Sequence, residues 1–147
     1  MILAAIGDTG YKVMLLLHLL AVVIGFAPAW LWPALVRLTE NDSPEAAENL
    51  EVSIVRFSLP GIAVAGLVGF GLAGMSDKVY KMAQPWLAIA FVLWVVLLGI
   101  YFFVARPAIR AFRDGDKTKK GLLGMATGIS HLILVVMLFL MIFKPGA

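Results

Sequence analysis

Residues 13–36 read VMLLLHLLAVVIGFAPAWLWPALV, a stretch of 24 residues without Asp, Glu, Lys or Arg. A helix of about 20 apolar residues is long enough to cross the hydrocarbon core of a membrane. Three further stretches share this property, at residues 57–76, 85–105 and 121–143. These runs are much longer than barrel strands, and a helix satisfies its own backbone groups where lipid offers no partners. The sequence therefore predicts an all-α polytopic membrane protein, a four-helix transmembrane bundle of up-down topology forming a single membrane domain.

The composition of the whole chain agrees with this interpretation. Of its 147 residues, 62% are hydrophobic and 14% are charged, and the mean hydropathy is +0.97. Soluble domains contain about 45–50% apolar and about 25% charged residues, so a soluble globular enzyme is disfavoured. The absence of cysteine excludes disulfides, thiolate metal sites, iron–sulfur clusters and cysteine nucleophiles.

Basic residues flank the apolar runs, so the formal charge of +3 indicates membrane topology and no nucleic-acid partner. Eight of the twelve Lys and Arg residues fall on the side that holds the first and third loops. Cytoplasmic loops carry this excess, so we expect both termini to lie on the outer face of the membrane.

The two loops on the predicted inner side carry opposite charge. Residues 37–56 sum to −3 and residues 106–120 to +4, so the loops are expected to pair with each other or with lipid headgroups. Within the first loop, Ser43-Pro44-Glu45 has the pattern of an N-cap, a first-turn proline and an acidic first turn, which predicts a surface helix leading into the second span. Its acidic face is either solvated or a docking face for a partner.

The ends of the spans on this inner side also carry arginines. Arg56 and Arg106 serve either as membrane anchors or as ligands of an anionic lipid or a cofactor propionate. Pro107 is expected to end the third span, so that residues 108–113 form a short amphipathic piece at the interface.

Small residues predict which helix faces pack. The second span contains a ladder of small residues spaced four apart, namely Gly61, Ala65, Gly69 and Ala73. Such ladders let helix backbones approach closely in a membrane, and they also leave room for a flat ligand. The last span has a shorter ladder at Gly124 and Gly128.

His18 and His131 are the two histidines of the chain, and both lie inside spans. Each shares a helix face with small residues and is therefore expected to point into the bundle. An ionisable side chain in lipid is a candidate functional group, and the alternative is a neutral histidine bonded across helices. From the helix rise, His18 lies ~9 Å and His131 ~20 Å from the outer boundary, which disfavours these two as paired ligands of one iron.

Methionines lie at a depth similar to that of His18. Met14 is one turn away on the same helix, and Met137 and Met141 lie near the end of the last span. Histidine with methionine is an axial pair for haem iron, and thioethers with imidazole suit Cu(I). The candidate cofactor-binding residues are His18, His131 and Met137, and the candidate metal ligands are His18, Met14, Met137 and Met141. The alternative for the methionines is core filling. No catalytic residue is predicted.

The early helix motif Leu17-His18-Leu19-Leu20, followed by a Trp/Pro/Leu/Arg exit, and the closing Phe143-Lys144-Pro145 resemble the HemJ and CopD-like superfamily of small four-helix membrane proteins. This resemblance implies a bacterial inner membrane location. In HemJ the histidine of the first helix is linked to haem b binding and protoporphyrinogen oxidation, which implies haem binding at His18. CopD relatives are associated with copper uptake.

Three functions follow as hypotheses. The first is a membrane protein that binds haem b inside the bundle, with His18 and either Met137 or His131 as axial ligands, and serves redox or haem handling. The second is a non-catalytic accessory subunit of a larger respiratory or transport complex, with lipid and other membrane subunits as partners. The third is a copper permease or chaperone.

Overall fold

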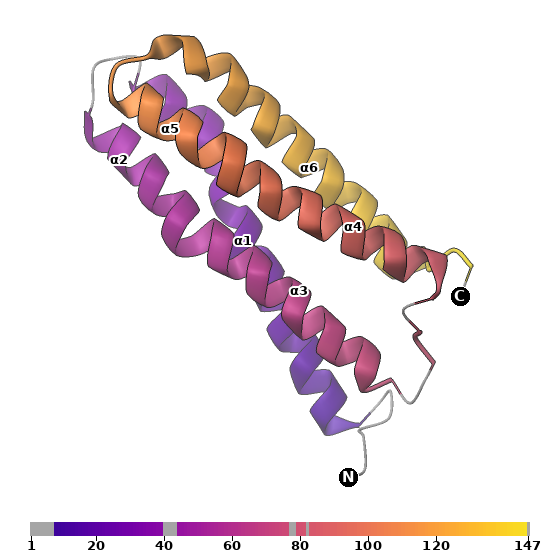
Figure 1. The fold of residues 1–147 in the computed structure, drawn as a ribbon. Coiled ribbons are helices and arrows are strands. Elements are labelled where there is room, and N and C mark those ends of the chain that lie inside the picture. The colour runs from indigo at the N-terminus through magenta and orange to yellow at the C-terminus, as the bar shows by residue number, and fades with distance from the viewer. Residues whose placement is uncertain (1–7, 40–43, 77–78, 82, 147) are drawn as a thin grey trace.

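The computed structural model describes residues 8–39, 44–76, 79–81 and 83–146, although side chains are not described for residues 33–39 and 44–47. The described chain forms four long helical rods (Figure 1). Each rod is long and apolar enough to cross a membrane, so the predicted all-α four-helix membrane bundle is confirmed. The rods comprise α1 (Thr9–Thr39); α2 (Pro44–Ser53), η1 (Ile54–Ser58) and α3 (Leu59–Gly74); α4 (Pro85–Gly99), η2 (Ile100–Ala105) and α5 (Arg106–Arg113); and η3 (Lys117–Lys119) and α6 (Lys120–Phe143).

The second and third rods extend beyond the predicted spans at the same end of the bundle. The predicted surface helix at Pro44 is present as α2 and continues into α3 without a break, whereas its predicted cap, Ser43, lies outside the described residues. Pro107 does not end the helix, which continues as α5 to Arg113. The short amphipathic piece expected at residues 108–113 is therefore present, but as the end of the third rod.

A π-helical stretch explains how the chain passes this proline. Proline lacks an N–H donor, and its ring crowds the carbonyl group four residues earlier. In η2 the turn is wider, and the N–H of Arg106 bonds to the carbonyl of Tyr101, five residues back. Pro60 follows η1 in the same way, so both rods use a wide turn next to a proline.

All four rods share one core at the predicted inner end. Trp32, Ile54, Tyr101 and Ile109 are each at most 2% exposed and belong to one cluster of buried residues, together with Leu123 of α6. The side chain of Glu51 in α2 forms salt bridges with Arg110 and Arg113 of α5. The expected pairing of the acidic and basic inner loops is therefore present at this carboxylate.

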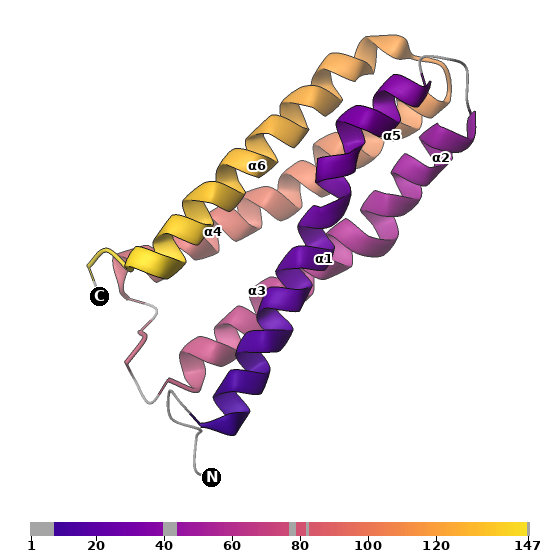
Figure 2. The same cartoon turned by 180° about the vertical axis from the view of Figure 1, so that it is seen from behind.

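Toward the end that holds both termini, the rods separate into two pairs, α1 with α3 and α4 with α6 (Figure 2). A small second core holds α4 and α6 together and consists of Trp86, Leu87, Ala90 and Leu140. The α1–α3 pair has a close backbone contact at the edge of the shared core, beside Phe26 and Ile62. A Cβ atom on Gly61 would lie 2.6 Å from the Cα atom of Gly25, so the predicted close approach at the small-residue ladder is confirmed for this pair.

Candidate functional site

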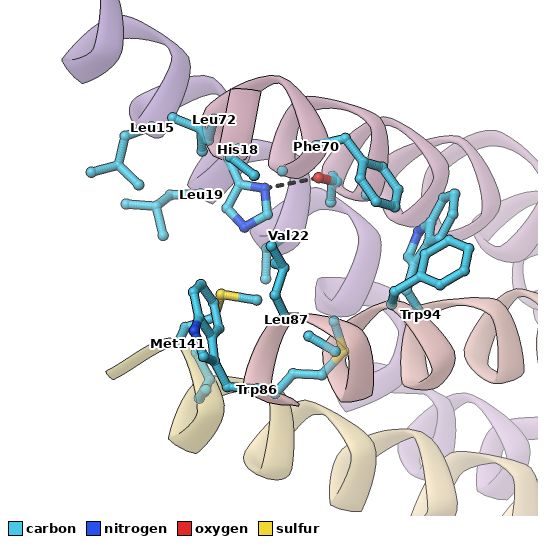
Figure 3. Close-up of a pocket in the computed structure, with 18 of the residues that line it drawn as sticks. Leu15, His18, Leu19, Val22, Phe70, Leu72, Trp86, Leu87, Trp94 and Met141 are labelled. Atoms are coloured by element: carbon cyan, nitrogen blue, oxygen red, sulfur yellow. Dashed lines mark hydrogen bonds between the residues drawn. The ribbon is translucent and has the colours of Figure 1, made fainter. Parts of the chain in front are cut away.

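A cavity of about 480 Å³ lies between the two helix pairs where they separate. Its lining is mostly apolar and comes from all four rods. Figure 3 shows leucine and valine side chains around His18 on one side, and Trp86, Leu87 and Met141 on the other. The polar groups of the lining are those of Tyr11, His18, Tyr80, Trp86, Trp94 and Lys144. An apolar cavity of this size with a few polar groups is typical of a cofactor or small-molecule site.

The ring of His18 has a defined orientation and proton position. Its Nδ1 atom lies 2.8 Å from the carbonyl oxygen of Ala65 in α3. A carbonyl oxygen only accepts hydrogen bonds, so Nδ1 carries a proton, and in the neutral ring Nε2 keeps its lone pair. Figure 3 shows the second ring nitrogen turned away from this carbonyl, toward the space between the helix pairs. Metal-binding histidines typically donate their other N–H group to a backbone carbonyl or a carboxylate in this way.

The small-residue ladder of α3 makes this orientation possible. A Cβ atom on Gly69 would lie 3.2 Å from Cε1 of His18, so the imidazole rests against the helix where no side chain intervenes. One turn earlier, Ala65 supplies the carbonyl acceptor. A further turn back, Gly61 allows α1 to approach α3. Three positions of one predicted ladder therefore hold the single histidine of this cavity.

Both methionines of α6 named by the sequence, Met137 and Met141, line the cavity together with His18. Met14 does not line it. Its methyl carbon lies 3.0 Å from where a Cβ atom on Gly71 would be, so Met14 packs against α3. Within the described residues, no group of three His, Cys, Asp or Glu side chains could hold a metal ion, so a metal here would depend on imidazole and thioether donors.

The structure places His131 outside this cavity and does not bring it to His18. The His131 ring lies 4.4 Å from the Trp30 ring, measured between centroids. Its Nε2 atom is buried and has no hydrogen-bond partner within the described part of the chain. The hydroxyl groups of Thr127 and Ser130, which precede His131 on the same helix, donate hydrogen bonds to the carbonyl groups of Leu123 and Ala126.

The expectation that Gly124 and Gly128 face the bundle is wrong. Both are exposed, and a Cβ atom on either would meet nothing within 4 Å. The face of α6 that enters the core carries Leu123, Ala126 and Ile133 instead. Because glycine has no side chain, its position in a sequence marks both tight contacts and open surface, and only the partner helix distinguishes them.

One end of the cavity carries a cation and a phenol that the sequence reasoning did not connect. The ammonium group of Lys144 donates a hydrogen bond of 2.6 Å to the hydroxyl oxygen of Tyr80, and both residues line the cavity. Lys144 has a φ of 43°, a left-handed conformation that ends α6. The boundary position of Lys144 was visible in the sequence, whereas Tyr80 lies in a loop that gives no pattern.

An aromatic wall links the two helix pairs and was also missed. The indole N–H of Trp94 in α4 donates a hydrogen bond of 2.8 Å to the carbonyl oxygen of Ile62 in α3. A Cβ atom on Gly66 would lie 2.0 Å from the Trp94 ring, so the indole occupies the space that this glycine leaves. Phe70 and Phe91 pack edge to face beside it, at 5.2 Å between centroids.

Comparison of the chain with protein-family models, curated proteins and solved structures gives no match.

Proposed function

We propose that this membrane protein binds haem b in the cavity between its helix pairs, with His18 as an axial ligand. The observation that carries the proposal is the hydrogen bond from Nδ1 of His18 to Ala65, which leaves the lone pair of Nε2 free at an apolar cavity. The resemblance of the first helix to HemJ, in which the corresponding histidine is linked to haem b, is in accord with it.

The residues around the cavity fit such a group in three respects. The volume of about 480 Å³ lies within the range of about 300–1,000 Å³ for cofactor sites. Met137 and Met141 line the same cavity as His18 and would offer thioether sulfur to the iron. Lys144 at the end of the cavity offers a cation for a propionate group.

When bound, haem b would supply one-electron redox chemistry, and a methionine ligand beside histidine would raise its reduction potential. The contribution of the chain is to present an unprotonated nitrogen and to exclude water with apolar walls. Gly69 and Ala65 fix the imidazole ring, so the ligand nitrogen keeps its direction without reorganisation.

An absorption spectrum of the purified protein with haem supplied tests this proposal. We expect a Soret band and a pyridine haemochrome in a ratio near one haem per chain, both lost in His18→Ala. His131→Ala is the matched control, because it removes the other imidazole from outside the cavity. A protein that stays colourless after haem supplementation, or that loses haem equally in both variants, would refute the proposal.

The same cavity favours Cu(I) as a second candidate, because it joins one imidazole and two thioethers in an apolar setting. Metal analysis of the same preparation separates the two candidates. Anaerobic binding of one Cu(I) per chain that requires His18, Met137 and Met141, without a haem spectrum, would favour copper permeation or delivery.

An accessory role in a larger membrane complex is favoured by a separate observation, the open helix face at Gly124 and Gly128. Small residues on a lipid-facing helix allow another helix to approach closely. Stoichiometric co-purification with other subunits in mild detergent tests this role, and Gly128→Leu would abolish it. Isolation of a lone chain at every detergent concentration would count against it.

We infer from the loop charges that both termini lie on the outer face of the bacterial inner membrane. The chain contains no cysteine, so single cysteines report its topology directly. Ala83→Cys lies in the loop at the end of the termini, and Glu48→Cys lies in α2 at the other end; both positions are exposed. An impermeant thiol reagent added to intact cells should label the Ala83→Cys variant. Labelling of only the Glu48→Cys variant would show that the orientation is opposite to the one proposed.

A further inference from the structure

We propose that Arg56 and Arg106 form a binding site for a phosphate group at the predicted inner end of the bundle, supplied by an anionic phospholipid. A cleft of about 170 Å³ lies here between the second and third rods. Three of the six residues that line it are arginines, and the full set is Glu51, Val52, Val55, Arg56, Arg106 and Arg110. This cleft shares no lining residue with the cavity around His18.

The charges in the cleft do not balance. Its one carboxylate, Glu51, is already bonded to Arg110 and to Arg113. Within the described residues, no carboxylate contacts Arg56 or Arg106. The two arginines therefore leave an excess of positive charge that an anion would neutralise.

Arg106 also carries a donor that lacks a partner. Its Nε atom is buried without a hydrogen bond to any described residue, and its guanidinium carbon lies 5.5 Å from the centre of the Phe102 ring. A buried donor without a partner is unfavourable, and more so when the group is charged. The planar guanidinium fork matches the geometry of phosphate oxygens, so Arg106 is suited to bind a phosphate group in the cleft.

The backbone explains why both arginines reach one cleft. Arg56 lies in η1, and Arg106 directly follows η2, so each arginine stands at a wide π-helical turn beside a proline. These turns occur at corresponding levels of adjacent rods, and the cleft is lined from both.

The position relative to lipid points to a headgroup as the source of the phosphate. Each arginine has an exposed phenylalanine close to it in sequence, on the side toward the middle of its rod. Phe57 is 50% exposed and Phe103 is 74% exposed. An acyl chain has apolar surface there, while the phosphate would lie among the guanidinium groups. In the orientation proposed above, this end lies in the leaflet that carries anionic lipids, where basic clefts between helices bind headgroups.

The test measures thermal unfolding of the full chain in nanodiscs of phosphatidylcholine, with and without phosphatidylglycerol, and in delipidated detergent with inorganic phosphate. We expect phosphatidylglycerol to raise the unfolding temperature of the wild type and to be retained selectively in native mass spectrometry. Arg56→Gln with Arg106→Gln should lower the lipid affinity at least about tenfold, because hydrogen bonds to charged groups contribute roughly 1.5–3 kcal/mol each. Lys81→Gln is the matched control, since it removes one positive charge from an exposed position at the opposite end.

The outcomes distinguish the sources of phosphate. Protection by phosphatidylglycerol that is lost in the arginine variant and kept in Lys81→Gln supports the lipid site. Equal protection by inorganic phosphate, lost in the same variant, supports the site with free phosphate as its ligand. If the glutamine variant does not fold, Arg106→Lys replaces it, because lysine keeps the positive charge but lacks the planar guanidinium group. The lysine variant should bind phosphatidylglycerol more weakly than the wild type does. A wild type without preference for phosphatidylglycerol or phosphate, or arginine variants that retain the full preference, would overturn the proposal.

Discussion

The contact between α1 and α3 is so close that one added methyl group should disturb both the fold and the cavity. In Gly61→Ala, the new Cβ atom would lie 2.6 Å from both the Cα and the N atom of Gly25. Carbon atoms pack favourably at about 3.5–4.0 Å, so the helices must separate by about 1 Å. The atoms that clash belong to the backbone, so no side-chain rotation can relieve them.

The size of the effect follows from this displacement. Overpacking of a filled contact costs about 1–3 kcal/mol, and each kcal/mol lowers the unfolding temperature of a chain of this size by roughly 2–4 °C. The hydrogen bond from His18 to the carbonyl oxygen of Ala65 is 2.8 Å long in the wild type, and Ala65 lies one helical turn from Gly61. A separation of about 1 Å would stretch it beyond hydrogen-bonding distance, so the imidazole loses its fixed orientation.

Thermal unfolding in one detergent, followed by circular dichroism, measures this loss. Gly128→Ala is the matched control, because its methyl group would meet nothing within 4 Å and Ala favours a helix over Gly by about 0.5–1 kcal/mol. We expect Gly61→Ala to unfold several degrees below the wild type and Gly128→Ala at or slightly above it. An unfolding temperature of Gly61→Ala at or above that of the wild type, or an equal loss in both variants, would refute the reasoning.

Three further changes test other contacts. Gly66→Ala would place a Cβ atom 2.0 Å from the Trp94 ring, so the indole must leave its position and Trp fluorescence should shift; an unchanged spectrum would contradict this packing. Glu51→Gln breaks the salt bridges between α2 and α5, but their partly exposed arginines limit the expected loss to below about 1 kcal/mol in chemical denaturation. The side chain of Thr118 donates a hydrogen bond to Asp116 and lowers the pKa of that carboxyl from its ordinary value of 3.8. Its contribution to stability is therefore present above that value and lost as the pH falls through the lowered pKa, so the difference in unfolding temperature between wild type and Asp116→Asn should vanish at low pH.

The architecture was predictable because its signals are local. The length of an apolar run and its lack of charge depend on the run alone, and they were sufficient for four rods. The position of His18 at the bundle interior also followed from its own helix, since it shares a face with small residues. Met137 and Met141 were placed at its level by counting residues along α6, and both do line the same cavity.

Features that depend on the rotation of one helix against another were not predictable in the same way. Met14 stands one turn from His18, yet it packs on Gly71 and not into the cavity. Gly124 and Gly128 have the spacing of a packing face, but α6 turns other residues into the core. Spacing fixes which residues share a face, whereas the choice of the buried face depends on partners that lie far away in the sequence.

The position of the cavity follows from how the bundle is held together. At the predicted inner end, one core joins all four rods, and the close contact of Gly25 with Gly61 holds α1 to α3 at the edge of this core. At the other end, the Trp86 core holds α4 to α6. The hydrogen bond from Trp94 to Ile62 crosses between the pairs where they begin to separate. His18 and the two methionines stand on opposite pairs, so a ligand bonded to both would connect halves of the bundle that otherwise diverge. A ligand that bound only the folded chain would raise its unfolding temperature with concentration, as mass action requires.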